Sequence, residues 1–81
     1  MYDYKSILKK LNDEQIWWLR CKVRAFNSYM NKNSHMTNYI EGQIKGFCIG
    51  LAYCDVITKI EADILEEDLH LLAVCGEELE L

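Results

Sequence analysis

Apolar residues recur at spacings of three and four in two long stretches of the chain, and this periodicity constrains its fold most strongly. Such spacing places each set on one side of an α-helix, where it forms a hydrophobic stripe that packs against another helix. The stripes comprise Ile16, Leu19, Val23, Phe26 and Met30, and then Ile40, Ile44, Phe47, Leu51 and Cys54. We expect them to form one intramolecular core, because helices this short do not make a coiled-coil dimer alone.

Helix-capping residues mark where the first two helices begin. Asp3 is placed to cap a short helix over residues 4–11. Asn12 is followed three residues later by Gln15, which is the spacing of a capping box. The second helix is therefore predicted to run from here to about residue 31, where a polar turn follows.

The third and fourth helices have similar signals. Thr37 or Asn38 opens the third helix, which is predicted to end near residues 54–55. Thr58 opens the fourth, with a glutamate three residues later to complete a second capping box. Gly76 is the natural residue just past its end, because glycine tolerates the left-handed conformation there.

The predicted fold class is all-α. The domain is a small four-helix bundle over residues 1–76, with one short N-terminal helix and three longer helices, followed by a short, mobile acidic tail over residues 77–81. At 51% hydrophobic residues, the chain is too apolar for disorder. Its longest apolar run, residues 46–54, is about half of a membrane span. The start of the chain has no signal-peptide pattern, so we expect a cytoplasmic protein that does not enter membranes.

Three glycines lie on the face of the third helix opposite its apolar stripe. Gly42, Gly46 and Gly50 recur every fourth residue, and Tyr53 flanks them. Each helical glycine costs about 0.5–1 kcal/mol relative to alanine, so the close approach of another backbone is the physical reason to keep three. We expect this helix to be central, with the glycines seated against the first or fourth helix. The alternative is a homodimer or partner interface.

The two halves of the chain carry opposite charge. Residues 1–40 hold seven Lys or Arg and three Asp or Glu, a net charge of +4, whereas residues 41–81 hold two and ten, a net charge of −8. Four polar residues share the outer face of the fourth helix: Asp63, Glu66, Glu67 and His70. Such a face is either solvated or docks on a basic surface, such as the nucleic-acid channel of another protein. Asp68 falls instead on the apolar arc, and we expect it to pair with a base of the second helix or to point into an interface.

The second helix carries a possible contact surface. Trp17 and Trp18 point about 100° apart, so Trp17 falls beside Arg20 and Arg24 on the polar side. A partly exposed tryptophan next to arginines suits a protein-binding hot spot. The same arginines with Lys32 suit phosphate contacts, which gives the alternative of nucleic-acid binding. A solvated face is the plain alternative.

Signals for catalysis or cofactors are weak. The four cysteines, Cys21, Cys48, Cys54 and Cys75, contain no C-x-x-C pair, and we expect buried reduced thiols. Glu67 and His70 have the spacing of half a di-iron site, but they face outward. We therefore predict no catalytic residue, no metal and no cofactor, and a protein that is not an enzyme.

Residues 39–47 (YIEGQIKGF), continuing through Gly50 and Leu51 to residues 56–62 (VITKIEA), resemble the helical hairpin of small orphan proteins encoded by phages and mobile elements. The resemblance covers under half of the chain. It implies a non-enzymatic accessory protein, in some cases an inhibitor of bacterial immunity such as an anti-CRISPR, and such inhibitors often bear acidic faces that imitate nucleic acid. It supplies no functional residue for this chain.

The leading prediction is a phage or mobile-element inhibitor or adaptor that acts in the host cytoplasm. It docks its acidic fourth helix on a basic surface of a host protein such as an immunity nuclease, with Trp17 and the second helix as a further contact. The first alternative is a small transcriptional regulator that binds nucleic acid through the second helix. The second is a homodimeric structural subunit built on the glycine face.

Overall fold

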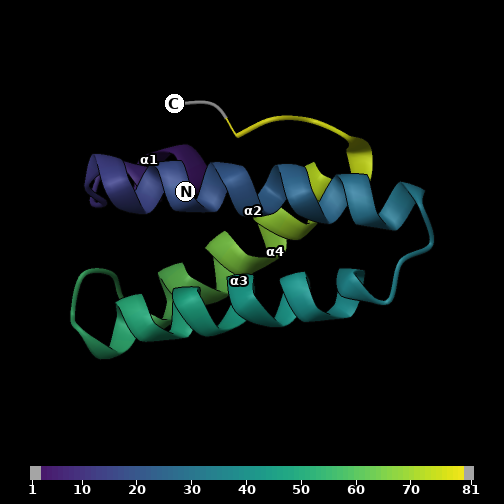
Figure 1. Ribbon diagram of the computed structural model, residues 1–81. Helices are drawn as coiled ribbons and strands as arrows, with labels where there is room; N and C mark the ends of the chain where they lie inside the picture. The colour runs from purple at the N-terminus through teal and green to yellow at the C-terminus, as the bar shows by residue number, and fades with distance from the viewer. Residues whose placement is uncertain (1–2, 80–81) are drawn as a thin grey trace.

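The computed structural model describes residues 3–79, which form four α-helices and no strand (Figure 1). The predicted all-α class, with one short N-terminal helix and three longer helices, is confirmed. The helices are α1 (Tyr4–Leu8), α2 (Asp13–Asn31), α3 (Met36–Tyr53) and α4 (Lys59–Cys75). Within the described residues, none of these helices combines the length and the apolar character needed to cross a bilayer.

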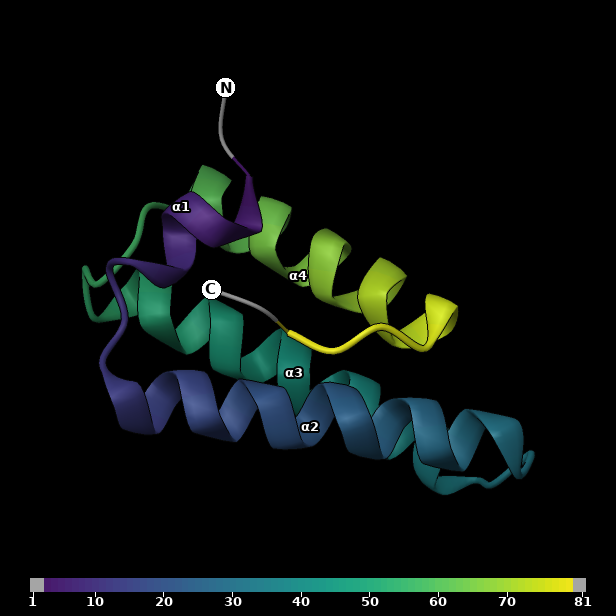
Figure 2. The same cartoon turned by 90° about the horizontal axis from the view of Figure 1, so that it is seen from above.

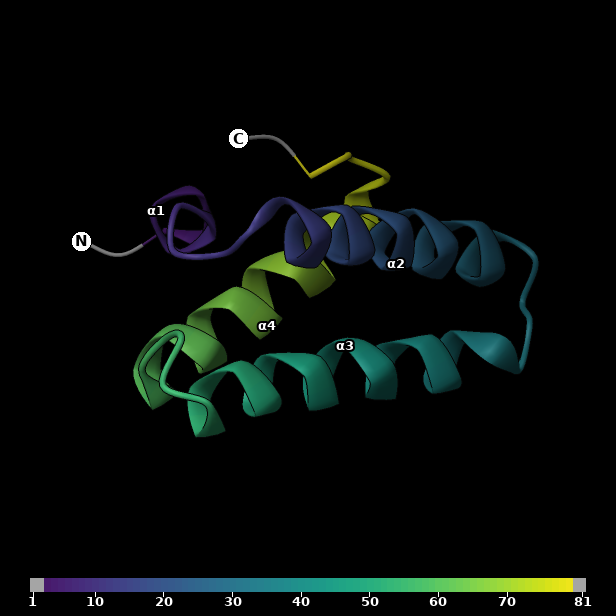
Figure 3. The ribbon, with the colours of Figure 1, turned by 60° about the vertical axis from the view of Figure 1, so that its left-hand side comes forward.

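The helices α2 and α3 run in opposite directions beside each other, and α4 crosses obliquely against both (Figures 1 and 3). The short helix α1 packs on α4. α4 therefore contacts each of the other three helices. The prediction that α3 is central is wrong, because α1 packs on α4 and leaves one side of α3 without a second layer.

Side-chain caps fix the starts of three helices as predicted. The Asp3 carboxylate accepts a hydrogen bond from the backbone N–H of Ser6 at 2.8 Å, which lowers the pKa of Asp3. Asn12 and Gln15 form the predicted capping box, with reciprocal bonds of 2.8 and 2.9 Å. The capping box at the start of α4 also forms. Gly76 follows that helix with φ +73°, in the predicted left-handed conformation.

Two predicted helix boundaries need correction. The first helix ends at Leu8 instead of residue 11, because the chain tightens there and the N–H of Leu11 bonds to the Leu8 carbonyl, three residues back. The third helix begins at Met36, before the predicted start, and its capping residue makes no side-chain hydrogen bond. Instead, the hydroxyl of Ser34 accepts a bond from the Met36 N–H at 3.1 Å.

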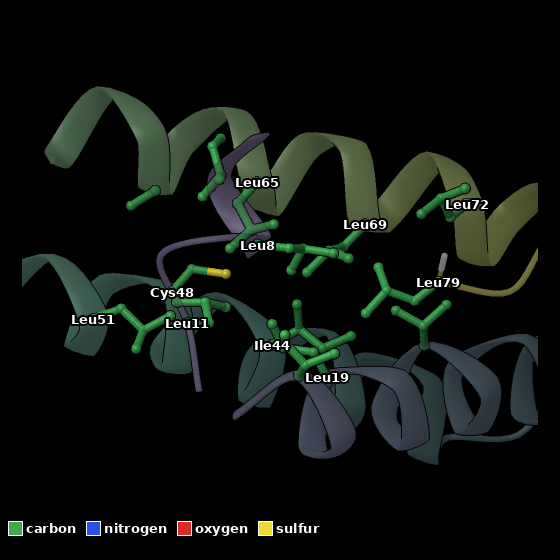
Figure 4. Packing of buried hydrophobic residues seen from close by; sticks show 14 of the residues in the cluster. Leu8, Leu11, Leu19, Ile44, Cys48, Leu51, Leu65, Leu69, Leu72 and Leu79 are labelled. Atoms are coloured by element: carbon green, nitrogen blue, oxygen red, sulfur yellow. The ribbon is translucent and has the colours of Figure 1, made fainter. Parts of the chain in front are cut away.

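The core lies between α2, α3 and α4, with α1 closing one end (Figure 4). Most residues of the predicted stripes are buried, and Met30 and Phe47 lie partly buried at the edge. Phe47 stacks on Trp18 with ring centroids 4.4 Å apart, which joins α3 to α2. Cys54, predicted as the last member of its stripe, is exposed because α3 has already ended.

The segment after α4 turns back and runs beside α2 (Figure 2). Leu79 is only 2% exposed and belongs to the hydrophobic core. Figure 4 shows it near Leu72, between α4 and α2. We expected a mobile tail, but residues 77–79 are held against the domain because Leu79 buries its side chain there. Residues 80–81 lie outside the described part of the chain.

Candidate functional site

A hollow of about 470 Å³ lies between α3 and α4. The four residues predicted to share the outer face of α4 all line it: Asp63, Glu66, Glu67 and His70. From the other side, α3 adds Glu41 and Lys45. Phe26, Ile44 and Ala73, which are buried core residues, also line the hollow. We call this hollow the acidic groove.

Charges in the acidic groove are only partly compensated. Lys45 Nζ lies 4.0 Å from Glu66 Oε1, and His70 Nδ1 lies 3.6 Å from Glu41 Oε1. The second contact is an ion pair only when His70 is protonated. These long contacts between largely exposed side chains contribute little to stability. Asp63 and Glu67 are both exposed and form no ion pair with any residue in the range 3–79.

The groove is therefore lined by four carboxylates and one lysine, together with apolar side chains. A lysine or arginine of another molecule could lay its aliphatic stem on the apolar lining and direct its charged group toward the carboxylates. His70 already packs its ring edge-on against Phe26, with centroids 5.5 Å apart. The arrangement thus suits binding of cationic side chains.

The contribution of α3 to this groove was not predicted from the sequence, which assigned no binding role to Glu41 or Lys45. Their positions on the helix could have indicated this contribution. Glu41 and Lys45 both flank Ile44, at the edge of the apolar stripe that packs against α4. Charged residues at such an edge line the seam between two packed helices.

The C-terminal segment contacts part of the predicted surface on α2. Arg20 donates from Nε to the carbonyl of Leu79 at 3.3 Å. Arg24 Nη2 lies 3.0 Å from Glu78 Oε1, and both of these side chains are exposed. Trp17 remains 62% exposed. Arg20 and Arg24 thus both contact residues 78–79, whereas the Trp17 side chain stays exposed.

The glycine face of α3 points away from the rest of the molecule. A Cβ atom at Gly42, Gly46 or Gly50 would meet no atom of another described element within 4 Å, and Tyr53 is 85% exposed. The expectation that the glycines seat α1 or α4 is wrong, because both of these helices lie on the other side of α3. The alternative of an interface with another chain stays open.

Asp68 does not pair with a base of α2. It is half-buried and lines a different hollow, together with Asp3 and Tyr4. The buried acid on this arc is Glu61, whose carboxylate contacts Lys10 at 2.7 Å in addition to its role as a cap. The expected ion pair between Asp68 and the second helix is therefore wrong, and the alternative that Asp68 points into an interface stays a prediction.

The cysteines differ in exposure. Cys48 is fully buried, and this burial raises the pKa of its thiol to about 12. Cys54 and Cys75 are exposed and Cys21 is half-buried, so the expectation of buried thiols is correct only for Cys48. Among residues 3–79, His, Cys, Asp and Glu side chains form no group of three or more that could hold a metal ion.

Comparison of the chain with protein-family models, with curated proteins and with solved structures found no match.

Proposed function

We propose that the protein is a non-enzymatic protein-binding module that docks its acidic groove on a basic surface of another protein. One observation carries this proposal: acidic residues of two helices converge on a single hollow that Lys45 and His70 compensate only in part. Asp63 and Glu67 stand exposed at this hollow.

Convergence of like charges has a physical consequence for binding. Carboxylates that line a hollow reinforce one another and raise the local concentration of cations and cationic side chains. Complementary charge then speeds encounter with a basic partner and penalises acidic partners. Binding through this groove is therefore expected to weaken with salt, because charges this exposed are screened.

The partner class that we propose is a nucleic-acid-binding protein, because such proteins have extended basic channels. The resemblance of residues 39–62 to phage-encoded orphan proteins favours a host immunity nuclease within this class. Trp17, which is exposed on α2, is a candidate for a further contact. In this proposal the acidic groove occupies a site that nucleic acid would otherwise fill.

The alternative, direct nucleic-acid binding by α2, has less support. Arg20 and Arg24 both contact the C-terminal segment, and Glu78 places a carboxylate where a phosphate would bind. A duplex would have to displace Leu79 from the core to reach Arg20 fully. This displacement would consume part of the binding free energy.

The test compares two matched double variants, each of which removes two carboxylates from the C-terminal half. Asp63→Asn/Glu67→Gln alters the groove, and Asp68→Asn/Glu77→Gln alters the separate hollow that α4 and the segment after it form with Asp3 and Tyr4. We expect the groove variant to bind an arginine-rich peptide at least about tenfold more weakly in calorimetry, equal to about 1.4 kcal/mol. We expect the control variant to bind like the wild type.

The same variants then serve as baits for capture of host proteins from lysate. Loss of the same basic nucleic-acid-binding proteins from the groove variant alone is the expected result. Equal peptide affinity for both variants would contradict the proposal. Tight retention on duplex DNA that Arg24→Ala weakens would support the alternative instead.

A further inference from the structure

The outer face of α3 is apolar, uncharged and uncovered. Tyr39 is 52% exposed, Ile49 is 40% exposed, and Tyr53 is the most exposed large apolar side chain, at 85%. Figures 1 and 3 show that α2 and α4 both lie on one side of α3 and that no other described helix lies on its opposite side. The charged residues of the helix, Glu41 and Lys45, lie on the flank that lines the acidic groove.

The glycines on this face do not seat any other described part of the chain. Each leaves open space where a Cβ would stand, so none is needed for packing against another element within residues 3–79. Glycine weakens a helix relative to alanine, and three of them in one helix therefore need another reason. Close approach of a backbone from outside the chain is a sufficient reason.

The order of residues along this face suits a second copy of the same chain. Tyr39, Gly42, Gly46, Gly50 and Tyr53 follow one another at intervals of three, four, four and three, a pattern that is symmetric about Gly46. In an antiparallel helix pair related by a two-fold axis at Gly46, residues equally far before and after position 46 lie opposite each other. Tyr39 then meets the partner's Tyr53, and Gly42 meets the partner's Gly50.

We propose that this face binds a second copy of the same chain, with α3 packed antiparallel on the partner's α3. The three glycines let the two backbones approach closely, and the tyrosines close both ends of the contact. The face carries no charged side chain, so two copies of a chain with a net charge of −4 can meet here without placing like charges in contact.

A hollow of about 780 Å³ borders this face beside Tyr53. Ile49, Ala52 and Val56 contribute apolar surface to it, and charged residues, among them Asp55, Lys59 and Asp63, complete its lining. In the antiparallel pair, the partner's Tyr39 lies at the edge of this hollow and can insert its ring. The face therefore offers both a projecting tyrosine and a recess for the partner's tyrosine, as a self-complementary surface requires.

The small size of the face favours a weak and transient dimer. From Tyr39 to Tyr53 the helix rises about 21 Å. Because one aromatic side chain can bury roughly 150–250 Å², the two tyrosines, Ile49 and the glycine backbone would bury on the order of 1,000 Å² over both copies. This area is at the lower limit of specific interfaces, so we expect a reversible dimer with a Kd in the micromolar range.

Sedimentation equilibrium over roughly 1–500 µM protein tests this proposal, since a micromolar dimer dissociates within that range. The wild type is expected to pass from monomer to dimer. Gly46→Leu is expected to raise the Kd at least tenfold while it keeps the helical circular dichroism and does not lower the Tm, because position 46 has open space in the monomer. Ser28→Leu, which adds the same side chain at an exposed position of α2, is the control and should dimerise like the wild type.

A wild type that stays monomeric up to the highest concentration would overturn the proposal. Unchanged association of Gly46→Leu would also overturn it, because the contact would then lie elsewhere. The Gly46→Leu variant should still bind the arginine-rich peptide, since the acidic groove lies on the other flank of α3. Failure of this proposal is therefore distinguishable from failure of the proposed function.

A pair of charged substitutions tests the antiparallel register of the two α3 helices. Tyr39→Lys and Tyr53→Glu are each expected to weaken the dimer, but in combination they place opposite charges across the antiparallel contact. The double variant should therefore associate more tightly than either single variant, and salt should weaken this gain. Weaker association of the double variant than of both single variants would indicate a parallel pair and would contradict the antiparallel register.

Discussion

Lys10 Nζ lies 2.7 Å from Glu61 Oε2, and this contact ties the turn after α1 to the first turn of α4. The Glu61 side chain is almost fully buried, whereas that of Lys10 is half-exposed. Glu61 also accepts a hydrogen bond from the backbone N–H of Thr58 at 2.9 Å, as part of the capping box. One carboxylate thus starts α4 and attaches α1 to it.

Removal of the lysine is expected to destabilise the fold. Lys10→Met leaves the buried carboxylate with fewer partners, and we expect a loss of about 1 kcal/mol in the free energy of unfolding at neutral pH. Glu61→Gln keeps a residue suited to the capping box but removes the charge. Urea unfolding of both single variants and the double variant gives the coupling energy, which should be clearly above zero. Additive losses would mean that the two side chains do not interact in solution.

The same pair predicts a pH dependence. The hydrogen bond from Lys10, followed by the bond from the Thr58 backbone, lowers the pKa of Glu61 in the folded state. A lowered carboxyl pKa stabilises the fold at pH values above the unfolded-state pKa of about 4.3, and this stabilisation is lost as the pH falls through the lower folded-state pKa. The difference in urea midpoint between wild type and Lys10→Met should therefore be constant near neutral pH and shrink on acidification. A difference that grows on acidification would contradict this assignment.

Replacement by alanine is expected to lower the free energy of unfolding at Gly76 and to raise it at Gly46. Gly76 has φ +73° and lies near the Asn27 amide, so Gly76→Ala should cost about 1 kcal/mol of unfolding free energy. Gly46 is helical and has open space, so Gly46→Ala should stabilise the monomer by about 0.5–1 kcal/mol. Thermal unfolding in dilute solution, where the monomer dominates, measures both. Destabilisation by Gly46→Ala under those conditions would mean that this face is packed within the chain.

The burial of Leu79 is expected to hold the C-terminal segment in place more strongly than the ion pair between Glu78 and Arg24. Leu79→Ala removes a buried side chain and should cost about 2 kcal/mol of unfolding free energy. Glu78→Gln breaks only an exposed pair with Arg24 and should cost less than about 0.5 kcal/mol. Urea unfolding separates the two. A larger loss for Glu78→Gln would show that charge, and not burial, holds the segment.

Thiol labelling reports on burial without a change of sequence. The pKa of Cys48 is raised to about 12 by burial, so its reactive thiolate is scarce in the folded chain near neutral pH. Brief treatment with iodoacetamide, followed by peptide mass spectrometry, should modify the exposed Cys54 and Cys75 and leave Cys48 intact. Denaturant should make Cys48 reactive. Rapid labelling of native Cys48 would contradict the packing of α3 in the core.

The helices could be predicted from the sequence because their signals are local. Asn12 and Gln15 specify a helix start through contacts within three residues, and Gly76 specifies a helix end through its own backbone. The apolar spacing likewise identifies which side of α2 and α3 is buried. Such signals act within one or two helical turns and do not depend on the tertiary arrangement.

The remaining features depend on residues far apart in the sequence. The glycine spacing showed that a backbone could approach α3, but it contained no information on whether any part of the chain does so. Leu79 lies among acidic residues, and its burial depends on α2 and α4 leaving room for it. The bond between Arg20 and Leu79 joins positions 59 residues apart. Pairings of this kind require knowledge of how the helices cross.

The most direct test of the proposed function is an amide chemical-shift titration of the nitrogen-15-labelled chain with an arginine-rich peptide. We expect the shifted signals to belong to residues on both sides of the acidic groove, namely Glu41, Lys45, Asp63 and Glu67. We expect little change at Ser28, which is exposed on α2. Shifts confined to α2 around Trp17 and Arg24, or no saturable shifts at the groove, would contradict the claim that the acidic groove is the binding surface.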